Sequence, residues 1–354
     1  MSPSLSAAGA DVDVAVIGSG FGGAAVACRL AKAGKKVAIL EQGKEYPTGR
    51  NEYEATGQGT ATIRHGHFWV DIGAGMDVIR GIGVGGGSLH YFGVRLRTHP
   101  EIFEHPRWPR SINRKVLDPY YDLAAEMLPA SPILPNPVVG PPARSAAFIA
   151  AAKNCRRCVG DPHHIPIAVN TAEDSVMTAA GVLQTRCVYC GECLIGCPPS
   201  ESFVGNVNAR ALLSLNYLAV ARQAGAAIYP LHRVRVIRKV KQGFEVDVVV
   251  LEPSTNADDE IGQIGALRAK QVVLGAGTMG SVEILLRSQV AGTLPPLSPM
   301  LGRHFSGNGD FLIPKTVHTP QDLQPNPVQR LPSAQTSARK TSRSSSKISD
   351  SFLL

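Results

Sequence analysis

The stretch Val12-Asp13-Val14-Ala15-Val16-Ile17-Gly18-Ser19-Gly20-Phe21-Gly22-Gly23 decides the fold of this chain. Its first six residues are mostly apolar and β-branched, and so short a run is typical of one buried strand. Residues 24–32 have the composition of a helix, and residues 35–40 predict a second strand that ends on Glu41. The order strand, G-x-G-x-x-G, helix, strand and acidic residue predicts a dinucleotide-binding βαβ unit.

Each glycine of the G-x-G-x-x-G pattern has a different physical task. Gly18 permits the tight turn, Gly20 lets the backbone approach a pyrophosphate, and Gly23 lets the helix and the strand pack closely. The N-terminus of the helix directs its N–H groups at the phosphates, and Glu41 is expected to accept hydrogen bonds from an adenosine ribose. The pattern leaves both FAD and NAD open as ligands. The residues predicted to bind the cofactor here are Gly18, Ser19, Gly20, Phe21, Gly22, Gly23 and Glu41.

A second glycine-rich segment, residues 80–91, reads Arg-Gly-Ile-Gly-Val-Gly-Gly-Gly-Ser-Leu-His-Tyr. So many glycines do not suit the interior of a helix or strand, because each one loses conformational entropy when it is ordered. Such a loop is useful where the backbone must lie against a flat or charged ligand. Farther along, residues 270–274 predict another apolar strand, and a glycine-containing turn at residues 275–281 leads into an apolar helix.

Together these segments resemble the glucose–methanol–choline (GMC) family of flavin oxidoreductases, and within it the bacterial cholesterol-oxidase-like branch. The resemblance implies FAD rather than NAD as cofactor, and hydride transfer from a CH–OH carbon to flavin N5. It also implies a sterol or another bulky apolar alcohol as substrate, and O₂ or a redox carrier as electron acceptor. The resemblance rests on residues 18–23, Glu41, residues 83–89, residues 117–122, residues 275–288 and residues 308–310.

The same resemblance implies further cofactor contacts. His90 follows a Gly-Gly-x-Ser pattern like the segment through which some family members attach FAD covalently to a histidine; the alternative, which we favour, is a noncovalent neighbour of the flavin. The other implied contacts are Gly83, Gly85, Gly86, Gly87 and Ser88 along the pyrophosphate and flavin, the backbone of Val234 at the adenine, Gly275, Ala276, Gly277 and Ser281 over the cofactor, and Asn308 and Asp310 near the isoalloxazine edge.

The cysteines predict a second, independent site. Residues 187–198 read C-x2-C-x2-C-x3-C-P, which is the ferredoxin spacing for a [4Fe–4S] cluster. A zinc site on the same thiolates, with His163 or His164 as a further ligand, and thiols without metal remain open. The lone Cys28 is expected to be a small core residue. The candidate metal ligands are Cys187, Cys190, Cys193 and Cys197 of the run, and Cys155 and Cys158 of a separate C-x2-C.

Composition narrows the possible functions. The chain of 354 residues is 44% hydrophobic and 18% charged, as in a globular protein. Its formal net charge is +8, and half of the excess lies in residues 315–354, which are rich in Ser, Pro and Gln and are expected to be disordered. No basic patch with interleaved aromatic residues indicates nucleic-acid binding. No apolar run predicts a membrane span, and no secretion signal is visible, so a cytoplasmic location is expected.

We expect an α/β fold: a FAD-binding Rossmann-like (doubly wound) domain, a Cys-rich insert and an incomplete α+β substrate domain. Family chains are longer and place a catalytic His near the C-terminus, so we expect a C-terminally truncated chain and name no catalytic base. The expected function is a FAD-dependent alcohol oxidoreductase resembling cholesterol oxidase; the alternative is a catalytically incomplete FAD-binding or iron–sulfur fragment that needs a partner chain. The expected parts are residues 1–130, the first part of the FAD-binding domain; 131–206, a Pro-rich connector and the Cys-rich insert; 207–269, a helix and β-rich segment; 270–314, the return to the FAD domain and the start of the substrate domain; and 315–354, the tail.

Overall fold

The fold was determined from a computed structural model of the whole chain. The structure describes residues 11–46, 62–65, 68–73, 75–136, 140–154, 156, 161–172, 175–191, 193, 197, 208–251 and 262–307. Four of the predicted site residues, Asn308, Asp310, Cys155 and Cys158, lie outside these ranges, as does the tail. The chain divides into two compact units, Met1–Ile133 with Ile165–Leu301, and Leu134–His164 with Gly302–Leu354.

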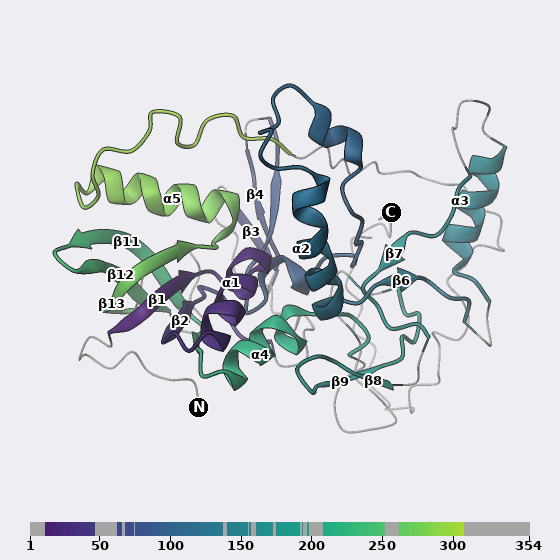
Figure 1. Cartoon of the computed structure of the whole chain (residues 1–354), viewed down its shortest axis with the longest axis horizontal. Helices are drawn as coiled ribbons and strands as arrows, with labels where there is room; N and C mark the ends of the chain where they lie inside the picture. Colours follow the sequence, from purple (N-terminus) through teal and green to yellow (C-terminus); the bar gives the residue numbers. More distant parts are fainter. Residues whose placement is uncertain are drawn as a thin grey trace, which may run out of the picture. The chain divides into compact units, whose positions relative to one another are not determined.

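The first unit is built on a six-stranded sheet with the order β10-β2-β1-β13-β12-β11 (Figure 1). β1, β2 and β10 run parallel to one another, and the last part of β13 runs parallel to β1. The first part of β13 pairs antiparallel with β12, which in turn pairs antiparallel with β11. The expected doubly wound α/β fold is therefore confirmed. The strand bounds are β1 Val12–Ile17, β2 Val37–Leu40, β10 Ala227–Tyr229, β11 His232–Val240, β12 Gly243–Leu251 and β13 Gly262–Leu274.

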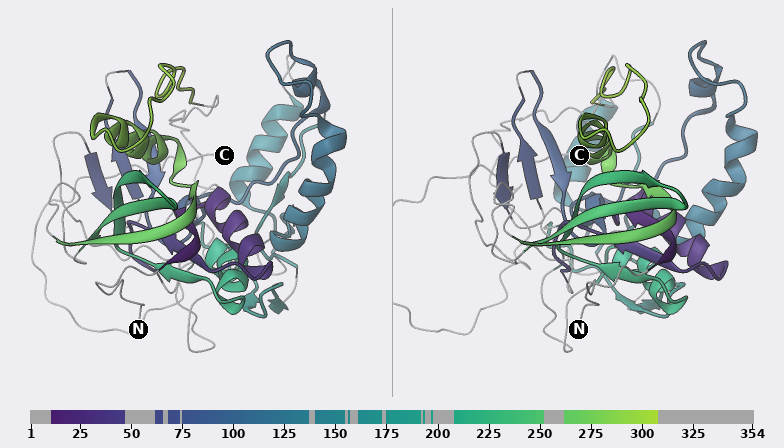
Figure 2. Two further views of the ribbon diagram at one scale, coloured as in Figure 1. Left: turned by 60° about the vertical axis from the view of Figure 1, so that its left-hand side comes forward. Right: turned by 90° about the vertical axis from the view of Figure 1, so that its left-hand side faces the viewer.

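Helices cover both faces of this sheet, with α5 (Gly277–Val290) on one side and α1 (Phe21–Lys32) with α4 (Tyr217–Gln223) on the other (Figures 1 and 2). Successive residues of a strand face opposite sides. Val14 and Val16 therefore pack in the core with α1 and α4, whereas Ala15 and Ile17 pack in the core with α5. A strand buried on both faces explains the continuous apolar run. Cys28 lies in the α1 core, 4% exposed, as predicted.

The remaining elements are short, apart from two helices. Helix α2 (Arg114–Met127) begins at Arg114, because the Asn113 side chain accepts a hydrogen bond from the Val116 N–H (3.1 Å) and caps the first turn. The others are β3 Thr62–His65, β4 Phe68–Asp71 and β5 Val78–Gly81, which form a three-stranded antiparallel sheet; η1 Gly86–Leu89; η2 Pro100–Glu104; β6 Ser131–Pro132 with β7 Pro166–Ile167; α3 Ala143–Lys153; β8 Ser175–Met177 with β9 Leu183–Thr185; and η3 Leu213–Leu215.

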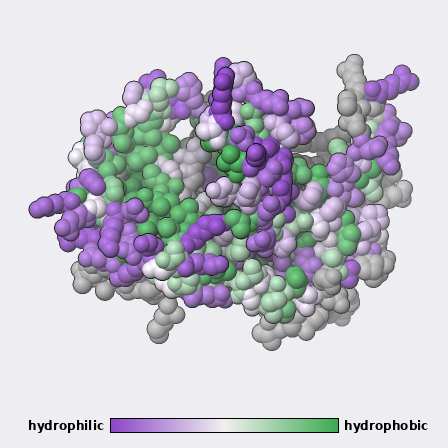
Figure 3. All heavy atoms as spheres, in the orientation of Figure 1, coloured by the Kyte–Doolittle hydropathy of each residue, from purple (hydrophilic) through white to green (hydrophobic). Residues whose placement is uncertain are grey.

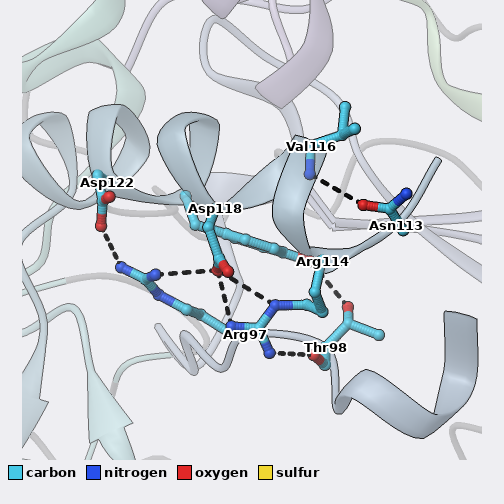
Figure 4. A network of polar contacts seen from close by, with 8 residues as sticks. Arg97, Thr98, Asn113, Arg114, Val116, Asp118 and Asp122 are labelled. Carbon is cyan, nitrogen blue, oxygen red and sulfur yellow. Dashed lines mark hydrogen bonds and ion pairs between the residues drawn. The ribbon is translucent and has the colours of Figure 1, made fainter. Parts of the chain in front are cut away.

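A charged network holds α2 to the segment before it (Figure 4). Arg114 pairs with Asp118 one turn along the helix (2.7 Å) and donates to the Thr98 carbonyl (2.9 Å). Arg97 reaches Asp118 (3.2 Å) and Asp122 from outside the helix. No residue of α2 is fully buried, and these partly exposed ion pairs join the helix to the preceding segment. Among the described helices, none has the length and apolar character that a membrane crossing requires.

One side of the first unit presents apolar surface. β12 pairs with β13 only as far as Ala269, so residues 270–274 of β13 pair with β1 alone among the described strands. Val290 on α5 is 90% exposed, and Figure 3 shows apolar side chains gathered over this helix. Apolar patches and unpaired strand edges are surfaces on which further polypeptide can pack.

Candidate cofactor site

Three glycines bring the ends of β1 and β13 against the start of α1. Gly18 adopts a φ of +92°, a conformation that favours glycine, and a Cβ there would lie 2.5 Å from the Gly275 oxygen. A Cβ on Gly23 would lie 2.0 Å from the Gly18 oxygen, and one on Gly275 would lie 2.8 Å from the Gly23 Cα. These contacts are too short for any side chain. The chain's own packing therefore requires glycine at all three positions.

Gly20 and Gly87 differ, because the packing of the chain does not explain them. Gly20 is the N-cap of α1 with φ −67°, and a Cβ there would have its nearest neighbour, the Gly275 oxygen, at 3.9 Å. A Cβ on Gly87 would meet nothing within 4 Å. Both positions leave space that a ligand can fill. They lie together, since a Cβ on the neighbouring Gly86 would be 2.7 Å from the Gly20 Cα. No side chain caps α1, so its first N–H groups are available to an anion. The residues present therefore fit a pyrophosphate.

Glu41 and Ser19 join β2 to both glycine-rich segments. Glu41 is 6% exposed, and its Oε2 accepts hydrogen bonds from the Ser19 N–H (3.0 Å) and the Ser19 hydroxyl (2.7 Å). Its Oε1 accepts from the Gly43 N–H (2.9 Å). Burial raises the pKa of Glu41, and the hydrogen bonds from Gly43 and Ser19 act in the opposite direction. A carboxylate has about four acceptor sites, and Ser19, Gly43 and the Gly83 backbone supply hydrogen bonds to this one.

The second glycine-rich segment is fixed by its own hydrogen bonds. The Gly85 N–H donates to the Ser19 hydroxyl oxygen (3.0 Å), so this serine connects segments that are far apart in the chain. The Ser88 hydroxyl donates to the Gly85 carbonyl (2.8 Å) and accepts from the Leu213 N–H (3.3 Å). Gly85 has a φ of +107°. The loop is thus preorganised beside the start of α1.

His90 and Tyr91 follow this loop and are largely buried. Burial lowers the pKa of His90 to about 4, and the positive charge of Arg210 adds to this shift. Burial raises the pKa of Tyr91 to about 12. The Tyr91 ring meets Phe21 edge to face at 5.4 Å, which brings the first residue of α1 to the end of the loop. His90 is therefore neutral at ordinary pH.

Val234 lies at the start of β11, where a β-bulge separates it from Val236. Two residues earlier, the His232 N–H donates to the Glu41 carbonyl oxygen (2.8 Å), on the edge of β11 that faces away from β12. Because main-chain groups alternate along a strand, the Val234 N–H and C=O face the same edge. This arrangement suits the backbone contact with adenine that the family resemblance implies. At the other end of the site, Ala276 is the N-cap of α5 and Gly277 begins it.

Sequence reasoning missed two buried residues near this site. His232 is 6% exposed, its Nδ1 lies 2.7 Å from the Pro230 carbonyl oxygen, and burial lowers its pKa. Arg210 is 1% exposed and contacts the loop at Leu89 and Tyr91. A single Arg within an otherwise apolar run, residues 209–213, was the available signal for the second residue.

The cysteine run lies apart from the glycine-rich segments in sequence, and its side chains are partly buried thiols. Burial raises the pKa of Cys187 to about 12, and the charges of Cys193, Cys190 and Cys197 add to the shift. All four cysteines of the run are partly buried. Among the described residues, no three His, Cys, Asp or Glu side chains gather as metal ligands do. The [4Fe–4S] cluster and the zinc alternative therefore stay predictions.

The comparisons with known proteins agree with the cofactor fold. A family model described as "DAO: FAD dependent oxidoreductase" matches residues 13–140. A cholesterol oxidase of Mycobacterium tuberculosis is 29% identical over 328 residues, which are 86% of this chain and 52% of that protein. A cholesterol oxidase of Acinetobacter baumannii is 25% identical over 323 residues, 86% of this chain and 55% of that protein.

A third relative, an uncharacterized GMC-type oxidoreductase of Mycobacterium tuberculosis, is 28% identical over 319 residues, which are 86% of this chain and 42% of that protein. The resemblance to GMC oxidoreductases of the cholesterol-oxidase-like branch is confirmed by these relatives. The chain spans about half the length of the curated relatives that it matches.

Proposed function

We propose that this GMC-like chain is the FAD-binding part of an alcohol oxidoreductase that resembles cholesterol oxidase. The observation that carries the proposal is the pair Gly20 and Gly87, where the chain leaves space that its own packing does not need. That space adjoins the uncapped start of α1 and the buried acid at the end of β2. The match of residues 13–140 to FAD-dependent oxidoreductases supports FAD as the occupant.

Each part of the site has a defined task toward the cofactor. The first N–H groups of α1 bind the pyrophosphate, and Glu41 accepts from the adenosine ribose. The Val234 main chain holds the adenine at the edge of β11. The loop Gly83–Ser88, fixed by Ser19, lies against the flavin. FAD, when bound, supplies an N5 atom that accepts a hydride from a CH–OH carbon.

The β13–α5 junction and His90 supply further contacts to the cofactor. Gly275, Ala276 and Gly277 close over the cofactor at the junction of β13 and α5. His90 is a noncovalent neighbour of the flavin, because its neutral ring is enclosed by the chain: a Cβ on Gly81 would lie 2.6 Å from it. We assign no catalytic base.

The substrate is a sterol or another bulky apolar alcohol, and O₂ or a redox carrier accepts the electrons. The names of the relatives support a sterol, because two of them are cholesterol oxidases.

A second candidate function is a FAD-binding fragment that is catalytically incomplete and needs a partner chain. The edge of β13 at residues 270–274, which pairs on one side only among the described strands, and the exposed apolar side chains of α5 favour it. In this case the chain binds FAD but does not oxidise alcohols alone.

One experiment separates the two candidates. The chain is purified, loaded with FAD and mixed anaerobically with cholesterol, while flavin absorbance is recorded; ethanol replaces cholesterol in a control. Bleaching of the flavin absorbance by cholesterol but not by ethanol supports the oxidoreductase. A stable flavin spectrum in both mixtures supports the fragment, and a chain that holds no FAD contradicts both proposals.

The cysteine run supplies no step in this function. Iron and acid-labile sulfide, measured in anaerobically purified protein, test the cluster that the sequence predicts. About four of each per chain would support a [4Fe–4S] centre, and values near zero would leave buried thiols.

A further inference from the structure

Arg210 is the largest side chain that the structure buries almost completely, at 1% exposed. It forms an isolated bridge with Val169 and lies just before η3. Placing a guanidinium away from water is costly unless hydrogen bonds and an opposite charge compensate it. The burial of the charged Arg210 side chain therefore needs a structural or functional reason.

Main-chain carbonyls supply most of the contacts of this guanidinium. Nη2 donates to the Leu89 oxygen (2.7 Å), and Nη1 donates to the Tyr91 oxygen (3.0 Å) and to the Cys193 oxygen. Nε is buried without a hydrogen-bond partner. None of the ion pairs formed by the described residues includes Arg210. Within the described structure, its charge therefore has no acidic partner.

The position of this charge relates it to the proposed cofactor site. Leu89 and Tyr91 directly follow the loop Gly83–Ser88, and Arg210 holds both of them. The charge acts on His90, where it adds to the effect of burial on the pKa, and on Tyr91, where it opposes that effect. The hydrogen bonds to Leu89 and Tyr91 therefore place the guanidinium beside the residues that border the proposed flavin site.

We propose that Arg210 is a positioning residue that locks the Leu89–Tyr91 turn and sets beside the cofactor loop a positive charge without an acidic partner among the described residues, favouring the reduced cofactor. The inference rests on the proposed binding of FAD. In alcohol oxidation the C–H bond breaks, its electron pair and proton pass together to flavin N5, and the hydroxyl proton leaves to solvent or a base. The alcohol is oxidised to a carbonyl compound, and the reduced flavin gains one negative charge. A preorganised positive charge stabilises that added charge.

The test compares Arg210→Met, which removes the charge, with Arg210→Lys, which keeps it without the forked geometry. Arg222→Met, which breaks an ion pair with Glu45 (2.6 Å), is the matched control. Each FAD-loaded protein is reduced anaerobically with a reference dye, so no substrate is needed. We expect Arg210→Met to lower the ratio of reduced to oxidised flavin about tenfold at a fixed potential, or about 30 mV for a two-electron couple. The ratio in Arg210→Lys should stay within about threefold of the wild-type ratio, and the ratio in Arg222→Met should equal the wild-type ratio.

Two results would overturn the inference alone: an unchanged ratio in Arg210→Met, or a shift in Arg210→Lys as large as in Arg210→Met. If Arg210→Met does not fold, Arg210→Gln supplies the neutral side chain while still donating to the carbonyls. A wild-type chain that binds no FAD overturns the proposed function together with this inference.

Discussion

The glycine-lined cofactor site and the cysteine run are specified in different ways. At the glycines, backbone packs directly on backbone: a Cβ on Gly23 would lie 2.0 Å from the Gly18 oxygen. At the cysteines, four thiols lie partly buried, yet among the described residues no set of metal ligands is gathered. Steric contacts within the chain determine the glycine-lined site. The cysteine run has the spacing of a metal-binding motif, but its described residues are not arranged as a set of metal ligands.

The largest effect is expected where backbone packing is tightest. Gly23→Ala should lower the free energy of unfolding by at least about 3 kcal/mol, because its Cβ would overlap the Gly18 oxygen. Urea unfolding measures this change. Gly265→Ala, where a Cβ would meet nothing within 4 Å, is the control and should change stability by less than about 1 kcal/mol. Equal effects of the two variants would show that the glycine contact does not determine the fold.

The cysteine side of the comparison predicts unreactive thiols. In chelator-treated native protein, Cys187 should be alkylated at least about 100-fold more slowly than in the unfolded chain, because burial suppresses its thiolate. Peptide mass spectrometry after timed labelling gives the two rates. Similar alkylation rates in the native and unfolded chains would mean that solvent reaches Cys187 in the native protein. The cysteine run would then differ from the glycine-lined site simply by being exposed.

His90 predicts a loss of stability in acid. Its pKa is about 4 in the folded chain against a reference of 6.5, so the unfolded chain binds more protons between these values. Its contribution to stability is therefore present above pH 6.5 and is lost as pH falls through about 4. His90→Gln should reduce the acid-dependent loss by at most about 3 kcal/mol, measured by urea unfolding at pH 4 and pH 7. The same loss in wild type and His90→Gln, or an equal reduction in the exposed His99→Gln, would contradict this.

The smallest effect is expected at the surface of α2. Asp118→Asn removes the partner that Arg97 and Arg114 share, but these ion pairs are partly exposed and screened by solvent. The melting temperature should fall by no more than about 3 °C. A fall of more than about 10 °C would mean that this network contributes as much as the glycine contacts.

Much of the fold followed from the sequence, because its signals are local. β1 and Glu41 were predicted from apolar runs and glycine spacing, and the structure places the glycines of both segments together. The start of α2 depends on Asn113, whose side chain caps the first turn ahead of Pro119. The helix expected within residues 207–269 is the short α4, preceded by the η3 turn.

The parts of the site that could not be predicted depend on contacts between distant residues. Ser19 was identified as a cofactor residue, but its hydrogen bond from Gly85 joins segments that only the folded sheet brings together. Arg210 meets Leu89 and Tyr91 in the same way, and no pattern of spacing encodes such a contact. His232 reaches Glu41 because β11 follows β10 at the end of β2.

The most direct test of the central claim is a titration of the purified chain with FAD, followed by the absorbance of the bound flavin. We predict one FAD per wild-type chain and at least about tenfold weaker binding to Gly20→Ala, because its methyl group would enter the space left for the pyrophosphate without disturbing the fold. Gly265→Ala should bind FAD as wild type does. Equal binding by wild type and a folded Gly20→Ala, or no binding by the wild-type chain, would contradict the account.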